Sequence, residues 1–308
     1  MRTLIVLCLL AFVAGASAEC GTCKTMKWGI CDGGSCQCGV PVGTGDKQAL
    51  DCTKLVPKCF LMKAEMYRAR NKLSTRTIGG KPVETAFVDN DGIYDPECEN
   101  NGRFKAVQCN GTETCWCVNS AGVRRSDKGD KNIKCEPVET YWVRLQMTHK
   151  KPNTTTTLDA SQLKTAIENV LGERYSLAKK FVTDVEYDGA ARRIVVDLKK
   201  QLGQDRDIDL PRVAYYMEKD IKVLPLFMDP KPFSLSTANT GVSMEDILVY
   251  YVDEQAPTFT MKNLTGGVIA VIVVVVLAVV IGLLALFFLR RREQANYKSQ
   301  ARELEPMS

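Results

Sequence analysis

Two apolar runs mark the ends of the chain. Residues 4–13 form an apolar run of ten after the basic residue Arg2, and the small residues Ala16 and Ala18 follow it. This order is typical of a secretory signal that is cleaved after Ala18. The alternative, an N-terminal membrane anchor, is disfavoured because ten residues are too few to cross a bilayer. The sequence therefore predicts a cleaved signal peptide over residues 1–18.

The second apolar run has the length of a membrane span. Residues 266–289 contain 24 residues without a charged side chain. As an α-helix this run is about 36 Å long, enough to cross a hydrocarbon core of about 30 Å with some tilt, and it has no polar face. Arg290, Arg291 and Arg292 follow it, and positive charge marks the cytoplasmic side. We therefore expect residues 19–265 outside the cell and residues 290–308 inside.

Regular hydrophobic periodicity appears in the cysteine-free residues 136–256, where alternation predicts strands and a spacing of three to four predicts helices. Its order is βαββαβ, which predicts an α+β fold with a sheet covered by two helices. The expected elements are a strand over 141–147, a helix capped by Asp159 and ended by Gly172, strands over 181–187 and 192–198 joined by a two-residue turn at Asp188-Gly189, a helix from Pro211 to about Ile221, and a last strand over 247–252.

Cysteines dominate the segment that precedes this periodic region. The chain has 13, of which Cys8 lies in the signal and the other twelve fall between Cys20 and Cys135. An even number in an exported segment predicts six disulfides, each contributing about 2–4 kcal/mol to a region with few long apolar runs. Spacing divides the cysteines into two groups and leaves the pairing within each group open.

Zinc binding is the alternative use of closely spaced cysteines, such as Cys20 with Cys23, Cys36 with Cys38, and Cys115 with Cys117. Zinc sites commonly mix cysteine with histidine. The single histidine, His149, lies outside the cluster. An oxidising compartment also favours disulfides. We therefore expect disulfides, with no metal and no cofactor.

Composition divides the chain into seven parts. The first cysteine group lies in a Gly-rich segment without periodic pattern, which predicts a small loop-rich module. The second group lies in a segment with a helix expected over 60–70 and strands expected over 104–107 and 115–118. The parts are a signal peptide (1–18), a cysteine-rich module (19–58), a second disulfide module (59–135), a cysteine-free α+β domain (136–256), a juxtamembrane linker (257–265), a transmembrane helix (266–289) and a cytoplasmic tail (290–308).

A motif of fixed spacing identifies the second module. It resembles the signature of thyroglobulin type-1 domains, and its residues are Gln108, Cys109, Cys115, Trp116, Cys117, Val118 and Gly122. The resemblance implies three disulfides: Cys59–Cys98, Cys109–Cys115 and Cys117–Cys135. It also implies that Trp116 is buried between disulfides, in a module with little other core.

The whole chain resembles the epithelial cell adhesion molecule and trophoblast cell-surface antigen family. The local matches are Asn90–Asp95, Cys115–Asn119, Ala121–Arg125, Ala214–Tyr216, Tyr250–Glu254 and Gly267–Val276, and those in the span favour the adhesion-molecule branch. In the first module the resemblance implies the disulfides Cys20–Cys36, Cys23–Cys52 and Cys31–Cys38. Two residues separate Cys20 from Cys23, where the family pattern has one.

The resemblance also implies partners. It implies a cis homodimer, in which the thyroglobulin-type module packs on the cysteine-free domain of its partner, and homotypic contact between epithelial cells at their lateral surfaces. Within the span, Ala278 and Gly282 are small residues four apart, which allows another helix to approach closely. The family links such a motif to claudin-type membrane proteins; chance placement of small residues is the alternative. Membrane-proximal and intramembrane proteases that release a signalling tail complete the implied set.

Charge and modification motifs add three features. Residues 63–81 carry six Lys and Arg against Glu65 alone, a balance of +5 that equals the net charge of the chain. This stretch is consistent with a solvated loop, a surface for an acidic partner or a protease-sensitive site. Asn110 and Asn153 lie in sequons expected to carry glycans, whereas Asn263 lies too close to the bilayer.

The sequence argues against catalysis. His149 is the only candidate for histidine-based chemistry, and its position beside two lysines predicts a solvated strand end. No phosphate-binding loop is present, and we expect no nucleic-acid partner. The favoured function is cell adhesion. The alternative is inhibition of cysteine proteases by the thyroglobulin-type module, an activity that the fold alone does not confer.

Overall fold

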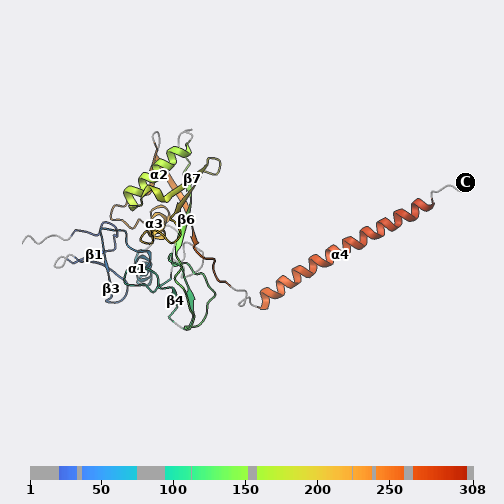
Figure 1. The fold of residues 1–308 in the computed structure, drawn as a ribbon, viewed down its shortest axis with the longest axis horizontal. Helices are drawn as coiled ribbons and strands as arrows, with labels where there is room; N and C mark the ends of the chain where they lie inside the picture. The colour runs from blue at the N-terminus through green and yellow to red at the C-terminus, as the bar shows by residue number, and fades with distance from the viewer. Residues whose placement is uncertain are drawn as a thin grey trace, which may run out of the picture. The chain divides into compact units, whose positions relative to one another are not determined.

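The computed structural model describes residues 21–32, 37–74, 94–111, 113–151, 158–223, 225–237, 241–259 and 266–303, with backbone alone at 223, 266–269 and 293–303. The chain divides into two compact units, Met1–Thr258 and Phe259–Ser308, which we describe separately (Figure 1). The predicted signal peptide lies outside the described residues.

The first module is more regular than its sequence predicts. Three short antiparallel strands form a sheet in the order β1-β2-β3, although no periodicity marks them. The disulfides Cys23–Cys52 and Cys31–Cys38 cross-link it. The pair expected between Cys20 and Cys36 lies outside the described residues. The strands are β1 (Ile30–Cys31), β2 (Cys38–Pro41) and β3 (Lys47–Leu50).

The second module consists of helix α1 (Lys58–Arg70) and the antiparallel pair β4 (Val107–Cys109) and β5 (Cys115–Cys117). α1 begins two residues before the predicted helix. The strand expected over 104–107 is wrong for most of its length, because Phe104 forms only an isolated bridge with Cys98 and regular pairing starts at Val107. The module contains the disulfides Cys59–Cys98, Cys109–Cys115 and Cys117–Cys135, the pairs that the resemblance implies.

The third part is an α+β domain, as predicted. Its antiparallel sheet has the order β7-β8-β6-β10-β9; α2 contacts β7 and β9, and α3 contacts β6 and β10. The core lies between helices and sheet, and its fully buried residues include Leu145, Ile194 and Tyr216. The elements are β6 (Thr140–His149), α2 (Ala160–Tyr175), η1 (Lys179–Phe181), β7 (Val182–Asp188), β8 (Arg193–Lys199), α3 (Leu210–Glu218), the π-helical turn η2 (Lys219–Val223), β9 (Ser234–Ser236) and β10 (Gly241–Asp253).

Several predicted boundaries in this domain are wrong. Asp159 caps α2 as expected, but the helix passes Gly172 and ends at Tyr175, because the buried Tyr175 hydroxyl donates a hydrogen bond to Asp220 (2.7 Å). The β7–β8 connection has four residues, because Asp188 pairs with Arg193 and its carboxylate accepts two backbone N–H groups of the turn. β9 was not predicted, and β10 begins earlier than the expected last strand.

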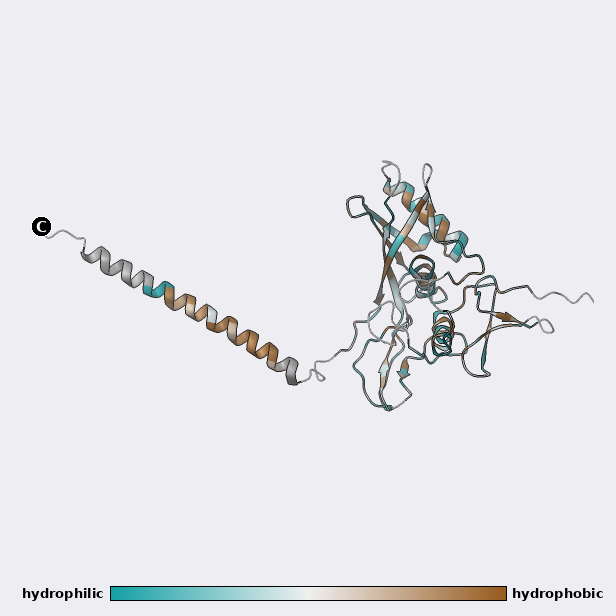
Figure 2. Cartoon of the chain, turned by 180° about the vertical axis from the view of Figure 1, so that it is seen from behind, coloured by the Kyte–Doolittle hydropathy of each residue, from teal (hydrophilic) through white to brown (hydrophobic). Residues whose placement is uncertain are grey.

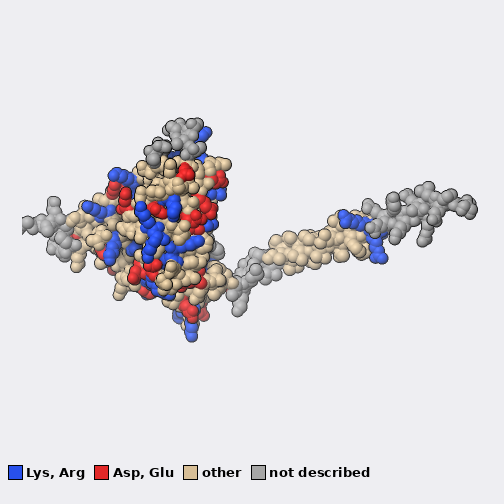
Figure 3. All heavy atoms as spheres, turned by 45° about the horizontal axis from the view of Figure 1, so that its top comes forward, with Lys and Arg blue, Asp and Glu red and all other residues tan. Residues whose placement is uncertain are grey.

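The second unit is helix α4 (Gly266–Glu303). Its stretch Ala270–Arg292 contains a window of 18 residues with a mean hydropathy of 3.5 and is long and apolar enough to cross a membrane. Figure 2 shows hydrophobic colouring along this stretch, and Figure 3 shows the basic residues that end it. The helix continues past the predicted end of the span at Leu289, because the arginines that follow are compatible with helix outside the hydrocarbon core.

Candidate interaction surface and module junctions

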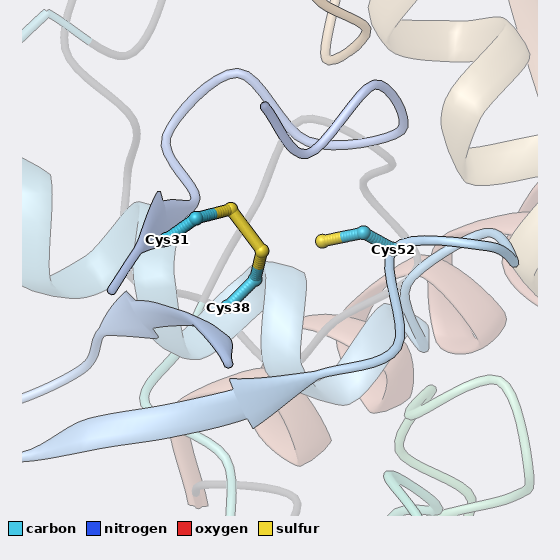
Figure 4. A group of neighbouring side chains, drawn as sticks. All are labelled: Cys31, Cys38 and Cys52. Carbon is cyan, nitrogen blue, oxygen red and sulfur yellow. A yellow bond between two sulfur atoms is a disulfide. The ribbon is translucent and has the colours of Figure 1, made fainter. Parts of the chain in front are cut away.

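Three cysteine sulfur atoms lie close together in the first module. The sulfurs of Cys31, Cys38 and Cys52 lie within 4.8 Å of one another (Figure 4). Cys31 is bonded to Cys38, however, and Cys52 is bonded to Cys23. Metal ligation by cysteine requires a thiolate. This group is therefore a pair of adjacent disulfides, consistent with the choice of cross-links over zinc.

The thyroglobulin-type motif builds the frame of the second module. The buried Gln108 side chain accepts a hydrogen bond from the Glu97 amide (2.7 Å) and donates to the Glu97 and Lys105 carbonyls (2.8 and 2.7 Å). Trp116 is buried against Tyr94, with ring centroids 5.9 Å apart in an edge-to-face arrangement. These contacts fix loops to one another, so the motif is structural.

Gly122 completes this frame. It has a φ of +76°, and a Cβ there would lie 2.5 Å from the Phe104 ring. Its carbonyl accepts a hydrogen bond from the buried Tyr94 hydroxyl (3.0 Å). Glycine is required both by the left-handed backbone and by the aromatic ring packed against it.

A buried ion pair joins the thyroglobulin-type module to the α+β domain. Glu65 of α1 and Lys219 of η2 are 1% and 3% exposed, and Lys219 Nζ lies 2.9 and 2.7 Å from the two Glu65 oxygens. The Tyr215 hydroxyl donates to the same carboxylate at 2.7 Å. Two charges this deeply buried are tolerated only when each is paired and hydrogen-bonded. The pair therefore fixes α1 against α3 and η2.

Lys58 adds a second buried cation to this junction. Its Nζ donates to the Tyr251 hydroxyl (3.2 Å) and lies over the Tyr251 and Tyr215 rings, at 4.5 and 5.4 Å from their centroids. Burial lowers the pKa of Lys58 to about 8, although the nearby carboxylates Glu218 and Asp209 oppose this shift. The ammonium group is held partly by aromatic faces, which suits a water-poor junction.

A second junction lies where β10 ends. Asp253 accepts hydrogen bonds from Asn119 Nδ2 (2.8 and 3.1 Å) and Thr140 Oγ1 (2.8 Å). Arg125 Nε lies 3.8 Å from the same carboxylate. Burial raises the pKa of Asp253, while these partners oppose the shift. Asn119 and Arg125 belong to the thyroglobulin-type module, so this network also holds two modules together.

The sheet has a second face, opposite the helices, on which most side chains are partly or fully exposed. Strand register places its residues in cross-strand rows, and Leu248 and Tyr250 of β10 are 37% and 44% exposed there. Sequence reasoning assigned only the buried positions of these strands; the same alternation also defines this face. Its rows are Asp184-Asp197-Arg144-Tyr250, Glu186-Val195-Gln146-Leu248 and Lys199-Trp142-Val252.

This open face is ordered by polar and cation–π contacts. Arg144 binds Asp197 through two hydrogen bonds (2.7 and 2.9 Å), which together with Lys199 lower the pKa of Asp197 against its burial. Lys199 Nζ lies 4.0 Å from the Trp142 ring centroid. The neighbouring row carries the apolar residues Val195 and Leu248, on either side of Gln146. The face thus combines preorganised charges with exposed apolar area, as protein interfaces do.

The basic stretch is described over residues 63–74. Two of its cations face Asp95: Arg70 is hydrogen-bonded to that carboxylate and Lys63 lies 4.0 Å from it. Arg68 instead lies over the Trp28 ring, 4.6 Å from its centroid. Figure 3 shows basic and acidic groups interspersed on the folded unit. The positive charge predicted from sequence is therefore partly neutralised within the chain.

The prediction for His149 was wrong in its environment. Its side chain is 2% exposed, Nδ1 lies 2.8 Å from the Lys150 carbonyl, and Nε2 lies 3.2 Å from the Tyr187 hydroxyl. Arg192 of the β7–β8 connection is hydrogen-bonded to the His149 backbone: its carbonyl accepts from the His149 amide (3.0 Å) and its guanidinium donates to the His149 carbonyl (2.9 Å). These bonds hold the connection close to His149. Both ring nitrogens are engaged in the domain interior, which gives the histidine a structural role.

The remaining predicted sites lie on surfaces or outside the described residues. Asn110 is exposed in the turn between β4 and β5, and Asn153 and Asn263 lie outside the described part of the chain. In α4, Ala278 and Gly282 are exposed and one turn apart, and a Cβ on Gly282 would meet nothing within 4 Å. Their geometry leaves room for a neighbouring helix.

Comparisons with known proteins identify two domains. Residues 67–135 match the family described as thyroglobulin type-1 repeat, and residues 140–253 match the family described as EPCAM/Trop-2, C-terminal. Tumor-associated calcium signal transducer 2 of Rattus norvegicus is 43% identical over 304 residues, covering 96% of this chain and 92% of the relative. Epithelial cell adhesion molecule of Bos taurus is 44% identical over 283 residues (89% and 84%), and that of Homo sapiens is 42% identical over 272 residues (85% and 81%).

These identities do not separate the two branches that the relatives represent. The similarity includes both matched domains and extends through most of the chain, and the structure adds the thyroglobulin-type disulfides and one helix suited to a membrane. The chain is therefore a single-pass membrane protein that belongs to the EPCAM/Trop-2 family.

Proposed function

We propose that this protein is a homophilic adhesion molecule of the plasma membrane, acting as a cis homodimer at lateral contacts between epithelial cells. Relatives are named as an epithelial cell adhesion molecule and as a calcium signal transducer, which supports a role in adhesion or signalling. The observation that carries the proposal is the open face of the five-stranded sheet. An ordered face with exposed apolar side chains, here Leu248 and Tyr250, is typical of a protein-binding surface.

The partner that this face suits best is a second copy of the chain. Three carboxylates on the exposed edge strand β7, at Asp184, Glu186 and Asp188, make one side of the face acidic. The thyroglobulin-type module carries the basic stretch 63–81, whose sequence balance of +5 is only partly offset by Asp95. Docking that module of one copy on the sheet of the other brings opposite charges together, which favours association and sets its orientation. A stable dimer requires about 1,000 Å² or more of buried surface.

Membrane partners are the second element of the proposal. Ala278 and Gly282 provide a surface on α4 for a helix of a claudin-type protein. We further propose that membrane-proximal proteolysis releases the ectodomain, and that an intramembrane protease then frees the cytoplasmic tail for signalling. Arg290, Arg291 and Arg292 anchor that tail at the inner leaflet until release.

The test places a charge in the centre of the open face. Leu248→Asp is expressed as full chain in non-adherent cells, with chemical cross-linking and cell aggregation scored together. Leu202→Asp is the matched control, because Leu202 is 60% exposed in a turn outside the strands. We expect Leu248→Asp to abolish the cross-linked dimer and aggregation while surface expression persists, and the control to retain both. An unchanged dimer with Leu248→Asp would contradict the assignment of this face.

A further inference from the structure

The residues that follow β10 are held on the thyroglobulin-type module. The Thr258 amide donates to the Arg125 carbonyl at 2.8 Å, and Ser126 and Thr258 form a parallel bridge. Arg125 Nη2 donates to the carbonyls of Gln255 (3.0 Å) and Ala256 (2.8 Å). The backbone just before the membrane unit is therefore bonded to another module on both its donor and its acceptor side.

The guanidinium group that makes these bonds is fixed in place. Arg125 is 6% exposed, and Asp253, which precedes the bound segment, lies 3.8 Å from its Nε. Asp253 is itself oriented by Asn119 and Thr140. Because this network orients the guanidinium before it meets the chain, little side-chain entropy is lost on binding residues 255–258.

Glu254 adds a second attachment at the start of the segment. Its amide donates to the Glu139 carbonyl (3.0 Å), and its carboxylate accepts from the Gly203 amide (3.2 Å). Residues 254–258 are thus fastened to the thyroglobulin-type module on one side and to the α+β domain on the other. We call residues 254–258 the strap. Their position in the sequence is that of a linker, but their backbone is hydrogen-bonded on both sides.

We propose that Arg125 is a clamp that controls cleavage of this strap, and so limits release of the ectodomain. This inference rests on the proteolytic release proposed above and assigns its regulation to named residues. Proteases bind a substrate chain in extended form through its backbone N–H and C=O groups. In residues 254–258 the groups named above are already bonded, so cleavage follows the population of the opened strap.

A clamp on the strap predicts local opening when Arg125 is replaced, whereas a contact that only stabilises the whole fold predicts global unfolding. Loss of the Arg125 side chain removes two charge-assisted hydrogen bonds from the strap but leaves the disulfides and cores of both domains intact. We therefore expect local opening without global unfolding. Opening exposes the peptide bonds of residues 254–258 first, so new cuts appear there and not elsewhere in the ectodomain.

The experiment compares Arg125→Ala with Arg103→Ala in the full chain. Arg103 is a matched control, because this exposed arginine of the same module also donates to a backbone carbonyl, that of Arg206 (2.8 Å), and its replacement leaves in place the Arg206 side chain that lies 4.0 Å from Glu254. Hydrogen exchange of the chain in lipid nanodiscs measures opening at the Thr258 amide. Treatment of intact cells with a nonspecific protease, followed by mass spectrometry of the released ectodomain, locates the cuts.

For Arg125→Ala we expect exchange at Thr258 and cutting within residues 254–258 to rise about tenfold or more, as loss of about 1.4 kcal/mol predicts. The control should match the wild type. Equal exchange and cutting in Arg125→Ala and wild type would overturn the clamp. If Arg125→Ala does not reach the surface, Arg125→Lys retains the charge beside Asp253 without the planar fork, and an intermediate rise is expected. Absence of cellular release with a protected Thr258 would refute only the proposed shedding.

Discussion

Removal of Lys219 tests whether the thyroglobulin-type module and the α+β domain unfold as one unit. In Lys219→Met, the Glu65 carboxylate remains 1% exposed and loses both ion-pair contacts, at 2.9 and 2.7 Å. The hydrogen bond from the Tyr215 hydroxyl is retained. Breaking a buried pair from one side costs about 3–5 kcal/mol, because an uncompensated charge remains in the interior.

The retained hydrogen bond places the expected loss near the lower end of this range, at about 3 kcal/mol. The double variant Lys219→Met/Glu65→Met removes both charges and replaces them with apolar groups. Replacement of a complete buried pair is often neutral or stabilising. We therefore expect the double variant to recover most of the loss, which gives a large interaction energy in the double-mutant cycle.

The assay uses one tryptophan in each of the three folded modules: Trp28, Trp116 and Trp142. Denaturant unfolding of single-tryptophan variants reports each module separately, under conditions that keep the disulfides intact. If the junction couples the modules, Lys219→Met lowers the unfolding midpoints of Trp116 and Trp142 together. A loss below about 1 kcal/mol, or a double variant as unstable as the single one, would refute the reasoning about Glu65.

Two further predictions concern stability. Lys58→Met should stabilise the ectodomain at pH 7 by at most about 3 kcal/mol, because burial lowers the pKa of Lys58 from 10.5 to about 8 and part of this cost is already offset by its aromatic and carboxylate neighbours. Between pH 8 and pH 10.5 the lysine of the unfolded chain binds more protons than the buried lysine of the folded chain. The free energy of unfolding of the wild type should therefore rise with pH in this range, and that of Lys58→Met should lack this rise. Denaturant unfolding at pH 7 and pH 9.5 measures the difference. Gly122→Ala should lose about 1–3 kcal/mol from its φ of +76° alone, and more from the Phe104 ring, seen as a lower Trp116 midpoint; an unchanged midpoint would contradict this.

Hydrophobic periodicity predicted most of the helices and strands of the α+β domain. The predicted elements occur in the predicted order, with the unpredicted β9 added before the last strand, because each long strand alternates and each helix buries one face, as Leu163 and Leu171 do in α2. The errors arise where a tertiary contact outweighs a local signal. Gly172 is a plausible stop, but burial of Tyr175 extends the helix; the Asp188-Gly189 pair is a turn signal, but carboxylate bonds to the backbone select a longer connection.

The junctions could not be derived from sequence. Glu65 stands alone among cations in its stretch, and nothing in the pattern indicates that it lies in the interior beside Lys219. Its partner is 154 residues away, and only the packing of α1 on α3 brings the two together. The open sheet face could have been predicted from the sequence, because Leu248 and Tyr250 alternate with the buried Ile247 and Val249.

The positions of the disulfides lead us to expect that the contact at Arg125 bears tension before β10 does. All described disulfides lie in the first two modules, whereas the membrane-spanning helix follows the α+β domain in sequence. Tension transmitted from the membrane along the chain would otherwise enter β10 directly and peel it from β6. Because Thr258 is bonded to Arg125, the force first meets a loop between Cys117 and Cys135, which are themselves bonded to each other. We therefore expect the cross-linked module to protect the open face on β10, although that module contributes no strand to its sheet.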